Sequence, residues 1–132
     1  MAASHYGLSE IEYDLMKMFW ASDHPLPFAE VLNYCNNEKN YGWAQTTLHT
    51  YLTRLIRKGV LHSDRKGYKK SYRPELTEAE LSHLYAGHFV EQSYGGSIKN
   101  LLVSLTYNTQ LSREEVSELQ KILEDNLNRD QQ

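Results

Sequence analysis

The stretch from Trp43 to Gly59, WAQTTLHTYLTRLIRKG, constrains the fold more than any other part of the chain. Its aliphatic side chains recur at spacings of three and four, which places them on one face of a helix: Leu48, Leu52, Leu55 and Ile56. Lys58 and Gly59 are typical of a helix C-terminus, because glycine readily takes the left-handed conformation and a cation suits the negative helix end. The pattern predicts a helix that buries one face.

The opposite face of this helix carries short polar or basic side chains. It includes Thr46, His49, Thr50, Thr53 and Arg57, and no aspartate or glutamate occurs from Trp43 to Ser63. A narrow face without acids, rich in hydroxyls, fits the major groove of DNA. We therefore interpret the stretch as a candidate DNA recognition helix. The alternative is a polar face that only meets solvent.

Charge is distributed unevenly along the chain. The formal net charge of the 132 residues is −3. From Lys39 to Arg73, however, nine basic residues face one acid, Asp64, which leaves +8 in this stretch and −11 in the remainder. A localised phosphate-binding surface would produce such an asymmetry. A solvated basic face would produce it equally well, so charge alone does not decide.

Two further helices are expected before the recognition helix. Ser9 to Glu12 reads as a capping box, in which a serine hydroxyl and a glutamate carboxylate satisfy each other's backbone amides. The helix that it opens has one apolar face, formed by Leu8, Ile11, Leu15, Met18 and Phe19. A second helix should begin near Pro27 and end at Asn36-Asn37, with Cys35 buried as a small apolar residue.

A basic hairpin is expected after the recognition helix. Residues 60–65 and 70–73 read as short strands around the turn Lys66-Gly67-Tyr68-Lys69, and Pro74 ends the second strand. Three helices followed by a basic hairpin is the order of a winged helix-turn-helix. Tyr68, at the tip, is expected either to pack on a sugar or to cover the turn.

Three amphipathic helices should complete the chain. Capping signals at Thr77–Glu80, Ser97 and Ser112–Glu115 open them, and the tail from Asn128 to Gln132 should fray. They are too few to enclose a core, so they either fold back or pack on a second copy. We favour a homodimer, because a two-fold dimer can read two half-sites. The expected dimerisation residues are Leu101, Leu102, Leu105, Val116, Leu119, Ile122 and Leu123.

The predicted fold class is mainly α with a small β-hairpin. Residues 1–75 should form the winged-helix DNA-binding domain and residues 76–132 the helical dimerisation domain. The chain has a single cysteine and no long apolar run, and its start, residues 1–4, has neither a basic nor a long apolar region. These features predict a cytoplasmic protein without membrane insertion.

No catalytic or metal-binding pattern is present in the sequence. His83 and His88 are five residues apart, which does not place two ligands on one helical face. There is no glycine-rich phosphate loop, nucleophile elbow or pair of catalytic carboxylates. We therefore expect no metal, no cofactor and no enzymatic activity.

Several segments, in order along the chain, resemble the BlaI/MecI/CopY family of bacterial repressors. The recognition-helix stretch matches the family pattern W-[ST]-x-x-T-[VL]-x-x-x-L-x-R-L-x-x-K-G, except that Ala44 replaces the usual serine or threonine. The other matching segments are Leu8 to Met16 with Phe19-Trp20, Tyr72-x-Pro74, Gly96 to Leu101, and Leu111 to Leu119. The resemblance covers roughly Gly7 to Leu127.

This resemblance implies a homodimeric winged-helix repressor on a palindromic operator with TACA/TGTA-like half-sites. It also implies genes of β-lactam resistance or copper handling. In the β-lactam branch, a membrane sensor's signal leads indirectly to cleavage of the repressor at an Asn-Phe bond. Here that position falls near Ser104-Leu105, which does not match, and the C-terminal cysteine pairs of the copper branch are absent.

Specific side chains can be assigned to DNA contact. Glutamine pairs with adenine, and threonine offers a hydroxyl and a methyl group to thymine. Arg54 should reach a phosphate or a guanine, or instead brace the helix through an ion pair. Wing cations should grip phosphate, or alternatively only prevent edge pairing. The predicted contacts are Gln45, Thr46, Thr47, His49, Thr50, Thr53, Arg54, Arg65, Lys66, Lys69 and Lys70.

Trp43 is expected to pack in the core or at the start of the helix instead of stacking on a base. Two alternatives to the leading function stay open at this point. The first is a winged-helix adaptor that binds protein without specific DNA binding. The second is a repressor of the same family that responds to a signal other than a β-lactam.

Overall fold

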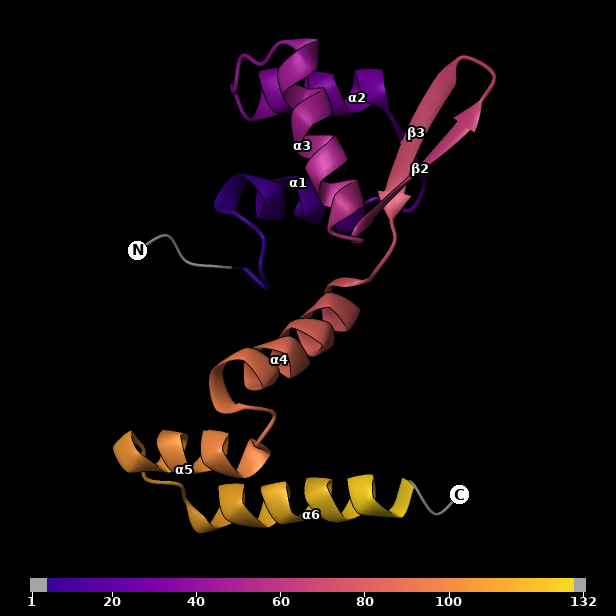
Figure 1. Ribbon diagram of the computed structural model, residues 1–132. Coiled ribbons are helices and arrows are strands. Elements are labelled where there is room, and N and C mark those ends of the chain that lie inside the picture. The colour runs from indigo at the N-terminus through magenta and orange to yellow at the C-terminus, as the bar shows by residue number, and fades with distance from the viewer. Residues whose placement is uncertain (1–4, 130–132) are drawn as a thin grey trace. The chain divides into compact units, whose positions relative to one another are not determined.

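The computed structural model describes residues 5–129 (Figure 1). One small antiparallel sheet is formed by strands that lie between or just after the first helices in sequence, and three more helices follow it. The predicted fold class, mainly α with a winged helix-turn-helix at the N-terminal end, is confirmed. The segments 1–4 and 130–132, which include the start without a secretion signal and most of the tail expected to fray, lie outside the described residues. The elements are α1 (Glu10–Ala21), β1 (Leu26–Pro27), α2 (Phe28–Asn33), η1 (Tyr34–Glu38), α3 (Gln45–Arg57), β2 (Leu61–Lys66), β3 (Lys69–Pro74), α4 (Glu78–Tyr94), α5 (Ile98–Asn108) and α6 (Arg113–Arg129).

Helix starts lie where the capping signals predicted them. The Ser9 hydroxyl accepts from the Glu12 amide at 3.2 Å, while the Glu12 carboxylate accepts from the Ser9 amide at 2.8 Å. The same reciprocal bonds join Thr77 with Glu80 and Ser112 with Glu115. These signals act within four residues, so they operate before any tertiary contact forms.

The core lies between α1, α2, α3 and the sheet. Leu48, Leu52 and Leu55 of α3 are buried, but Ile56 is 38% exposed, so its assignment to the buried stripe was wrong. At about 100° per residue, Ile56 lies roughly 80° from Leu48, whereas the three leucines lie within about 60° of one another. The buried stripe of α3 is therefore narrower than the sequence spacing indicated.

The buried face of α1 is also rotated from the predicted one. Met16 is fully buried, whereas Ile11 and Met18 are only partly buried. Leu15 and Phe19 are buried as expected, and Glu12 shares their face. Met16 lies about 100° from Leu15 in the direction of Phe19, which places the centre of the buried face away from Met18.

The sheet contains a strand that the sequence did not predict. The strand order is β1-β3-β2, with Leu26 and Pro27 of β1 opposite Tyr72 and Ser71 of β3. β1 has only two residues, one of them a proline, so it carries no periodic signal. Its pairing partner, β3, is also distant in sequence. The hairpin itself is longer than predicted, because Lys66 and Lys69 form its last pair and only Gly67 and Tyr68 make the turn. Gly67 has φ +63°, which a glycine adopts without strain.

The chain divides into two compact units, residues 1–87 and 88–132. The first turns of α4 belong to the first unit: Leu81 is buried, and Trp20 Nε1 donates to the Leu76 carbonyl at 2.9 Å. Tyr13 donates its hydroxyl to the Glu78 carboxylate, and this hydrogen bond is the main cause that raises the pKa of Tyr13 to about 12. The predicted division of function at residue 75 stays a prediction.

Candidate nucleic-acid interface

Most of the predicted recognition residues are exposed on α3. Gln45, Thr46, His49, Thr50, Thr53 and Arg54 are all exposed. Thr47 is half-buried, which makes it the predicted α3 contact least accessible to a ligand. Ala44, the N-cap residue just before α3, makes no side-chain capping bond, so the first-turn amides have no side-chain acceptor there.

Neighbouring groups already orient two of these side chains. The Thr50 hydroxyl donates to the Thr46 carbonyl at 3.0 Å, and its oxygen keeps lone pairs that can still accept a hydrogen bond. The His49 ring stacks on Phe28 of α2, with ring centroids 4.7 Å apart. Both contacts reduce the rotamer freedom that these residues would lose on binding.

A ladder of aromatic rings supports the N-terminal half of α3. Tyr41 stacks on Trp43 at 4.5 Å, and Trp43 stacks on Tyr51 at 4.8 Å. The Arg54 guanidinium lies over the Tyr51 ring, 5.6 Å from its centroid. Trp43 is partly buried and packs against the core, which confirms its expected structural role. Arg54 is therefore oriented by a ring, and no ion pair involves it in residues 5–129.

Asn36 sets the start of α3 through two hydrogen bonds to Trp43. Its Nδ2 donates to the Trp43 carbonyl at 3.0 Å, and its Oδ1 accepts from the Trp43 amide at 2.7 Å. Three residues that position the exposed face of α3, Asn36, Phe28 and Tyr51, were not predicted from the sequence. Tyr51 follows Trp43 by eight residues, which is close to two helical turns, but only the structure shows the loop residue Tyr41 completing the stack.

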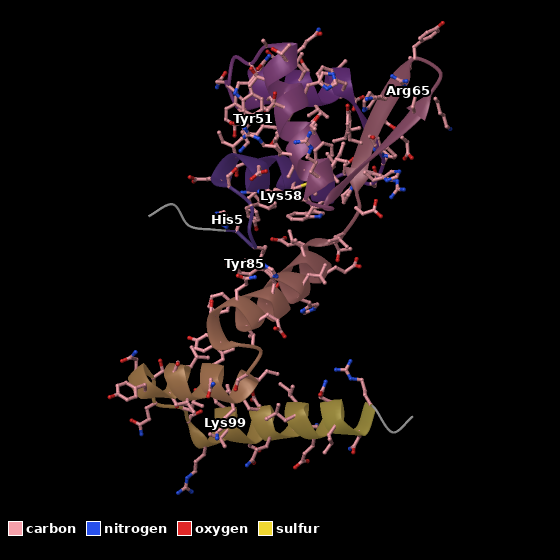
Figure 2. The ribbon with its side chains drawn as sticks, viewed as in Figure 1. His5, Tyr51, Lys58, Arg65, Tyr85 and Lys99 are labelled. Atoms are coloured by element: carbon pink, nitrogen blue, oxygen red, sulfur yellow. The ribbon has the colours of Figure 1, made fainter. Side chains whose placement is uncertain are left out.

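The wing carries unpaired cations. Arg65, Lys66, Lys69 and Lys70 are exposed, and none forms an ion pair within the described part of the chain. Figure 2 shows Arg65 on the hairpin beside α3. A hollow of about 280 Å³ lies between α3 and the wing and is lined by Phe28, His49, Arg65, Tyr68, Lys70 and Tyr72. His49 of α3 and two of the wing cations, Arg65 and Lys70, thus border one groove.

Two of the nine cations counted in the basic stretch serve the fold. Arg73 Nε lies 3.2 Å from the Asp64 carboxylate, across the hairpin, and Lys58 pairs with Glu12. Hydrogen bonds, first from His62 and then from Arg73, outweigh partial desolvation and lower the pKa of Asp64. The phosphate-binding capacity of the stretch is therefore smaller than its net charge of +8 indicated.

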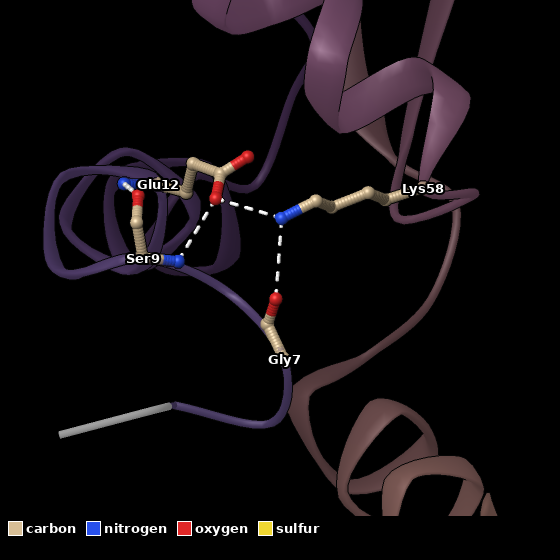
Figure 3. A network of polar contacts seen from close by, with 4 residues as sticks. All are labelled: Gly7, Ser9, Glu12 and Lys58. Atoms are coloured by element: carbon tan, nitrogen blue, oxygen red, sulfur yellow. Dashed lines mark hydrogen bonds and ion pairs between the residues drawn. The ribbon is translucent and has the colours of Figure 1, made fainter.

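Lys58 joins the end of α3 to α1 and to the N-terminal segment (Figure 3). Its Nζ donates to Glu12 Oε1 at 2.8 Å and to the Gly7 carbonyl at 3.1 Å. Glu12 is 3% exposed, and its second oxygen is buried without a hydrogen bond among residues 5–129. Burial raises the pKa of Glu12, but the hydrogen bonds from Lys58 and Ser9 outweigh it and leave the pKa lowered. The carboxylate therefore depends on Lys58 for compensation of its charge.

Replacing Lys58 with methionine should destabilise the first unit by about 1–2 kcal/mol, because it removes a charged hydrogen bond from a buried carboxylate while Lys58 itself is partly exposed. Folding lowers the pKa of Glu12. The contribution of this carboxylate to the free energy of unfolding is therefore complete above the ordinary pKa of 4.5, and it is lost as the pH falls through the pKa of the folded state. Urea unfolding at pH 7 and between about pH 5 and 3 measures both effects. Glu12→Gln is the control that should flatten the acid limb; a K58M curve identical to wild type would contradict the assignment.

The predicted dimerisation residues lie in the second unit. Leu101 and Leu102 are half-buried, whereas Leu105, Val116, Leu119, Ile122 and Leu123 are exposed. No residue described in α5 or α6 is buried. The second unit therefore presents a row of apolar side chains to solvent.

The last features of the described residues concern a metal site, a reactive thiol and a membrane-spanning helix. No group of three or more His, Cys, Asp or Glu side chains in residues 5–129 is arranged to hold a metal ion. Burial raises the pKa of the Cys35 thiol to about 11, so it is unreactive near neutral pH. Within the same residues, none of the helices has the length and apolar character needed to cross a membrane.

Comparison with known proteins identifies the family. A model of the penicillinase repressor family matches residues 8–125. The penicillinase repressor of Bacillus licheniformis is 31% identical over 122 residues, covering 92% of this chain and 93% of that protein. The methicillin resistance regulatory protein MecI of Mammaliicoccus sciuri is 26% identical over 121 residues, covering 89% and 94%. The solution structure of the DNA binding domain of the repressor BlaI is 29% identical, covers 61% of this chain and 93% of that one, and has a TM-score of 0.49. Because the family model and the Bacillus relative both span nearly the whole chain, the protein belongs to the penicillinase repressor family, whose members are transcriptional repressors and not enzymes.

Proposed function

We propose that this transcriptional repressor binds a palindromic operator as a homodimer, with α3 in the major groove and the wing on the adjacent backbone. The observation that carries the proposal is the groove between α3 and the wing, which is lined by His49 of α3 and by Arg65 and Lys70 of the wing, two cations without ion-pair partners in the described residues. A polyanion is the ligand that such a surface fits. The operator lies in the cytoplasm, where we place the protein.

Base contacts are assigned to the exposed face of α3. Gln45 suits adenine, and Thr46 and Thr50 suit thymine through their methyl groups. Arg54, oriented by the Tyr51 ring, is placed to reach a guanine edge or a phosphate. His49 and Thr53 complete this face, while Thr47 is a weaker candidate because it is half-buried. Arg65, Lys66, Lys69 and Lys70 are assigned to phosphates, which position the protein without specifying sequence.

The homodimer is inferred from the apolar residues of α5 and α6. A second copy is the partner that serves a DNA-binding protein best, because two-fold symmetry matches an operator with two half-sites. The half-sites are proposed to be TACA/TGTA-like, following the family resemblance. Ser104 and Leu105 lie inside α5 and are not an Asn-Phe pair, so the proposal includes no cleavage at that bond.

A salt series on a TACA/TGTA palindrome tests the function. Fluorescence anisotropy of the labelled duplex should show specific binding that weakens by about 10³-fold or more between about 50 and 200 mM salt, because several phosphates are neutralised. A duplex of the same composition with scrambled half-sites is the control and should bind at least about 10²-fold more weakly. No binding to the palindrome at the lowest salt would support the protein-adaptor alternative and reject the proposal.

A further inference from the structure

The segment before α1 makes a tight turn that its own sequence does not favour. His5 and Leu8 pair across it: His5 N donates to the Leu8 carbonyl at 3.2 Å, and Leu8 N donates to the His5 carbonyl at 3.0 Å. Both central residues have positive φ, +58° at Tyr6 and +84° at Gly7, as in a type I′ turn. Asparagine, aspartate or glycine usually takes the first central position, and a bulky tyrosine is strained there. Contacts outside the turn must therefore hold Tyr6 in this conformation.

The Tyr6 ring contacts two helices that are far apart in sequence. Its centroid lies 6.3 Å from that of Tyr13 on α1 and 6.4 Å from that of Tyr85 on α4, and both pairs meet edge to face. The ring is partly buried against the core. Edge-to-face pairs at these separations are favourable, so the contacts with the two helices compensate for the strained backbone of Tyr6.

Gly7 adds a second contact with α4 and one with α3. The Tyr85 ring packs against Gly7, since a Cβ atom built there would lie 3.8 Å from the ring (Figure 2). The Gly7 carbonyl accepts from Lys58 Nζ, at the end of α3, at 3.1 Å (Figure 3). The turn is thus joined to α1, α3 and α4, and we call its four residues, His5 to Leu8, the N-terminal clamp.

One face of α4 meets the first unit, and the clamp holds its far end. Glu78, Leu81 and Tyr85 recur at spacings of three and four, which places them on this face. The Glu78 carboxylate accepts from Tyr13, Leu81 is buried, and Tyr85 contacts the clamp about 10 Å along the helix from Glu78. Contacts at both ends of two helical turns fix the direction of a helix, whereas contacts at its first turn alone fix only its starting point.

We propose that the N-terminal clamp sets the half-site spacing that the repressor accepts, with Tyr6 as the residue that positions α4. The inference rests on the proposed function, because it needs a dimer with one α3 in each half-site. α4 continues as one helix to Tyr94, past residue 87 and into the unit assigned to dimerisation. A fixed direction of α4 in each protomer gives the two recognition helices one preferred separation.

The operator makes this separation measurable. One base pair added between the half-sites moves the second half-site by about 3.4 Å and turns it by about 35° around the duplex. A dimer with fixed recognition helices gains from its second half-site only at the spacing that matches its geometry. A dimer whose α4 can change direction accepts several spacings with similar affinity.

Replacing Tyr6 with asparagine removes the ring and keeps the turn, because asparagine followed by glycine is a preferred pair for a type I′ turn. On palindromes whose spacers differ by one base pair, wild type should bind the best spacing at least about 10-fold more tightly than the neighbouring ones. Y6N should reduce this ratio to within about threefold. Fluorescence anisotropy measures the ratio. Affinity for a duplex with one half-site should stay within about twofold of wild type, because Tyr6 belongs to neither α3 nor the wing.

Two further variants separate positioning from stability. Tyr6→Phe keeps the ring and should retain the wild-type spacing ratio. Val31→Ala opens a cavity in the core of the same unit, at a residue of α2 outside the clamp, and should retain the ratio as well. A ratio that falls in V31A as much as in Y6N would attribute the effect to lower stability and overturn the proposal.

Amide hydrogen exchange in the free protein tests the clamp apart from DNA binding. Residues 81–87 of α4 should exchange about 10-fold faster in Y6N than in wild type, whereas residues 48–56 of α3 should exchange at the same rate. Equal exchange at α4 overturns the clamp whether or not the protein binds an operator. A wild-type protein that binds no palindrome overturns the proposed function, and the spacing role with it. A Y6N variant that keeps the wild-type spacing ratio overturns only the role of the clamp.

Discussion

Replacing Leu119 and Leu123 of α6 with glutamate is expected to convert the protein to monomers and to weaken operator binding by about 10²-fold or more. Both side chains are exposed in the single chain, at 36% and 52%, and we assign them to the homodimer interface. A dimer binds its second half-site at an effective concentration in the millimolar range, so losing the dimer loses that gain. Sedimentation velocity measures the oligomeric state, and anisotropy measures the affinity.

The control for this variant adds the same charge to the opposite face of α6. Ser117 and Asn128 are exposed and lie roughly 160–180° around the helix from Leu119. The double variant S117E/N128E should remain dimeric and bind the operator as wild type does. A dimer that survives the leucine substitutions would place the interface elsewhere in the chain.

Replacing Lys66, Lys69 and Lys70 together with alanine should weaken binding to operator and to unrelated duplexes alike, by about 10²-fold at 0.1 M salt. The wing is assigned to phosphates, which are the same in every sequence. A dimer that loses six phosphate contacts should show a slope of log affinity against log salt that is smaller by up to about 5. Titration of both duplexes over a salt series measures the two quantities together.

A matched triple variant separates a local effect from a change in net charge. Lys17, Lys99 and Lys121 are exposed and lie outside both α3 and the wing. Their replacement by alanine changes the net charge by the same amount, and should alter the salt slope by less than about 1. A loss confined to operator DNA in the wing variant would mean that these lysines read bases.

Local sequence signals predicted the elements of the fold well. The capping boxes at Ser9, Thr77 and Ser112 marked helix starts that the structure confirms, because each consists of bonds within four residues. The leucine spacing of residues 48–55 likewise identified α3 and its buried face. β1 was missed because its two residues become a strand only by pairing with Tyr72 and Ser71.

The sequence predicted which residues are exposed at the candidate interface, but not which residues hold them in place or pair with their charges. The absence of acids from Trp43 to Ser63 identified the exposed face of α3, and the lysines around Gly67 identified the wing. The cations that remain available to bind a ligand are those without an ion-pair partner, and the partners lie on other strands or helices. Lys58 is bound by Glu12, 46 residues away, and Arg73 by Asp64 across the hairpin.

The sequence by itself therefore determined the order of the helices, the basic hairpin and the polar face of α3, since spacing, caps and charge are properties of neighbouring residues. Only the tertiary structure decided how that face is held: Phe28 under His49, the stack of Tyr41, Trp43 and Tyr51 under Arg54, and Lys58 anchored on a buried carboxylate. It also showed Tyr68 fully in solvent. Contacts between segments far apart in the chain produce no periodic pattern in the sequence, so only the tertiary structure shows them.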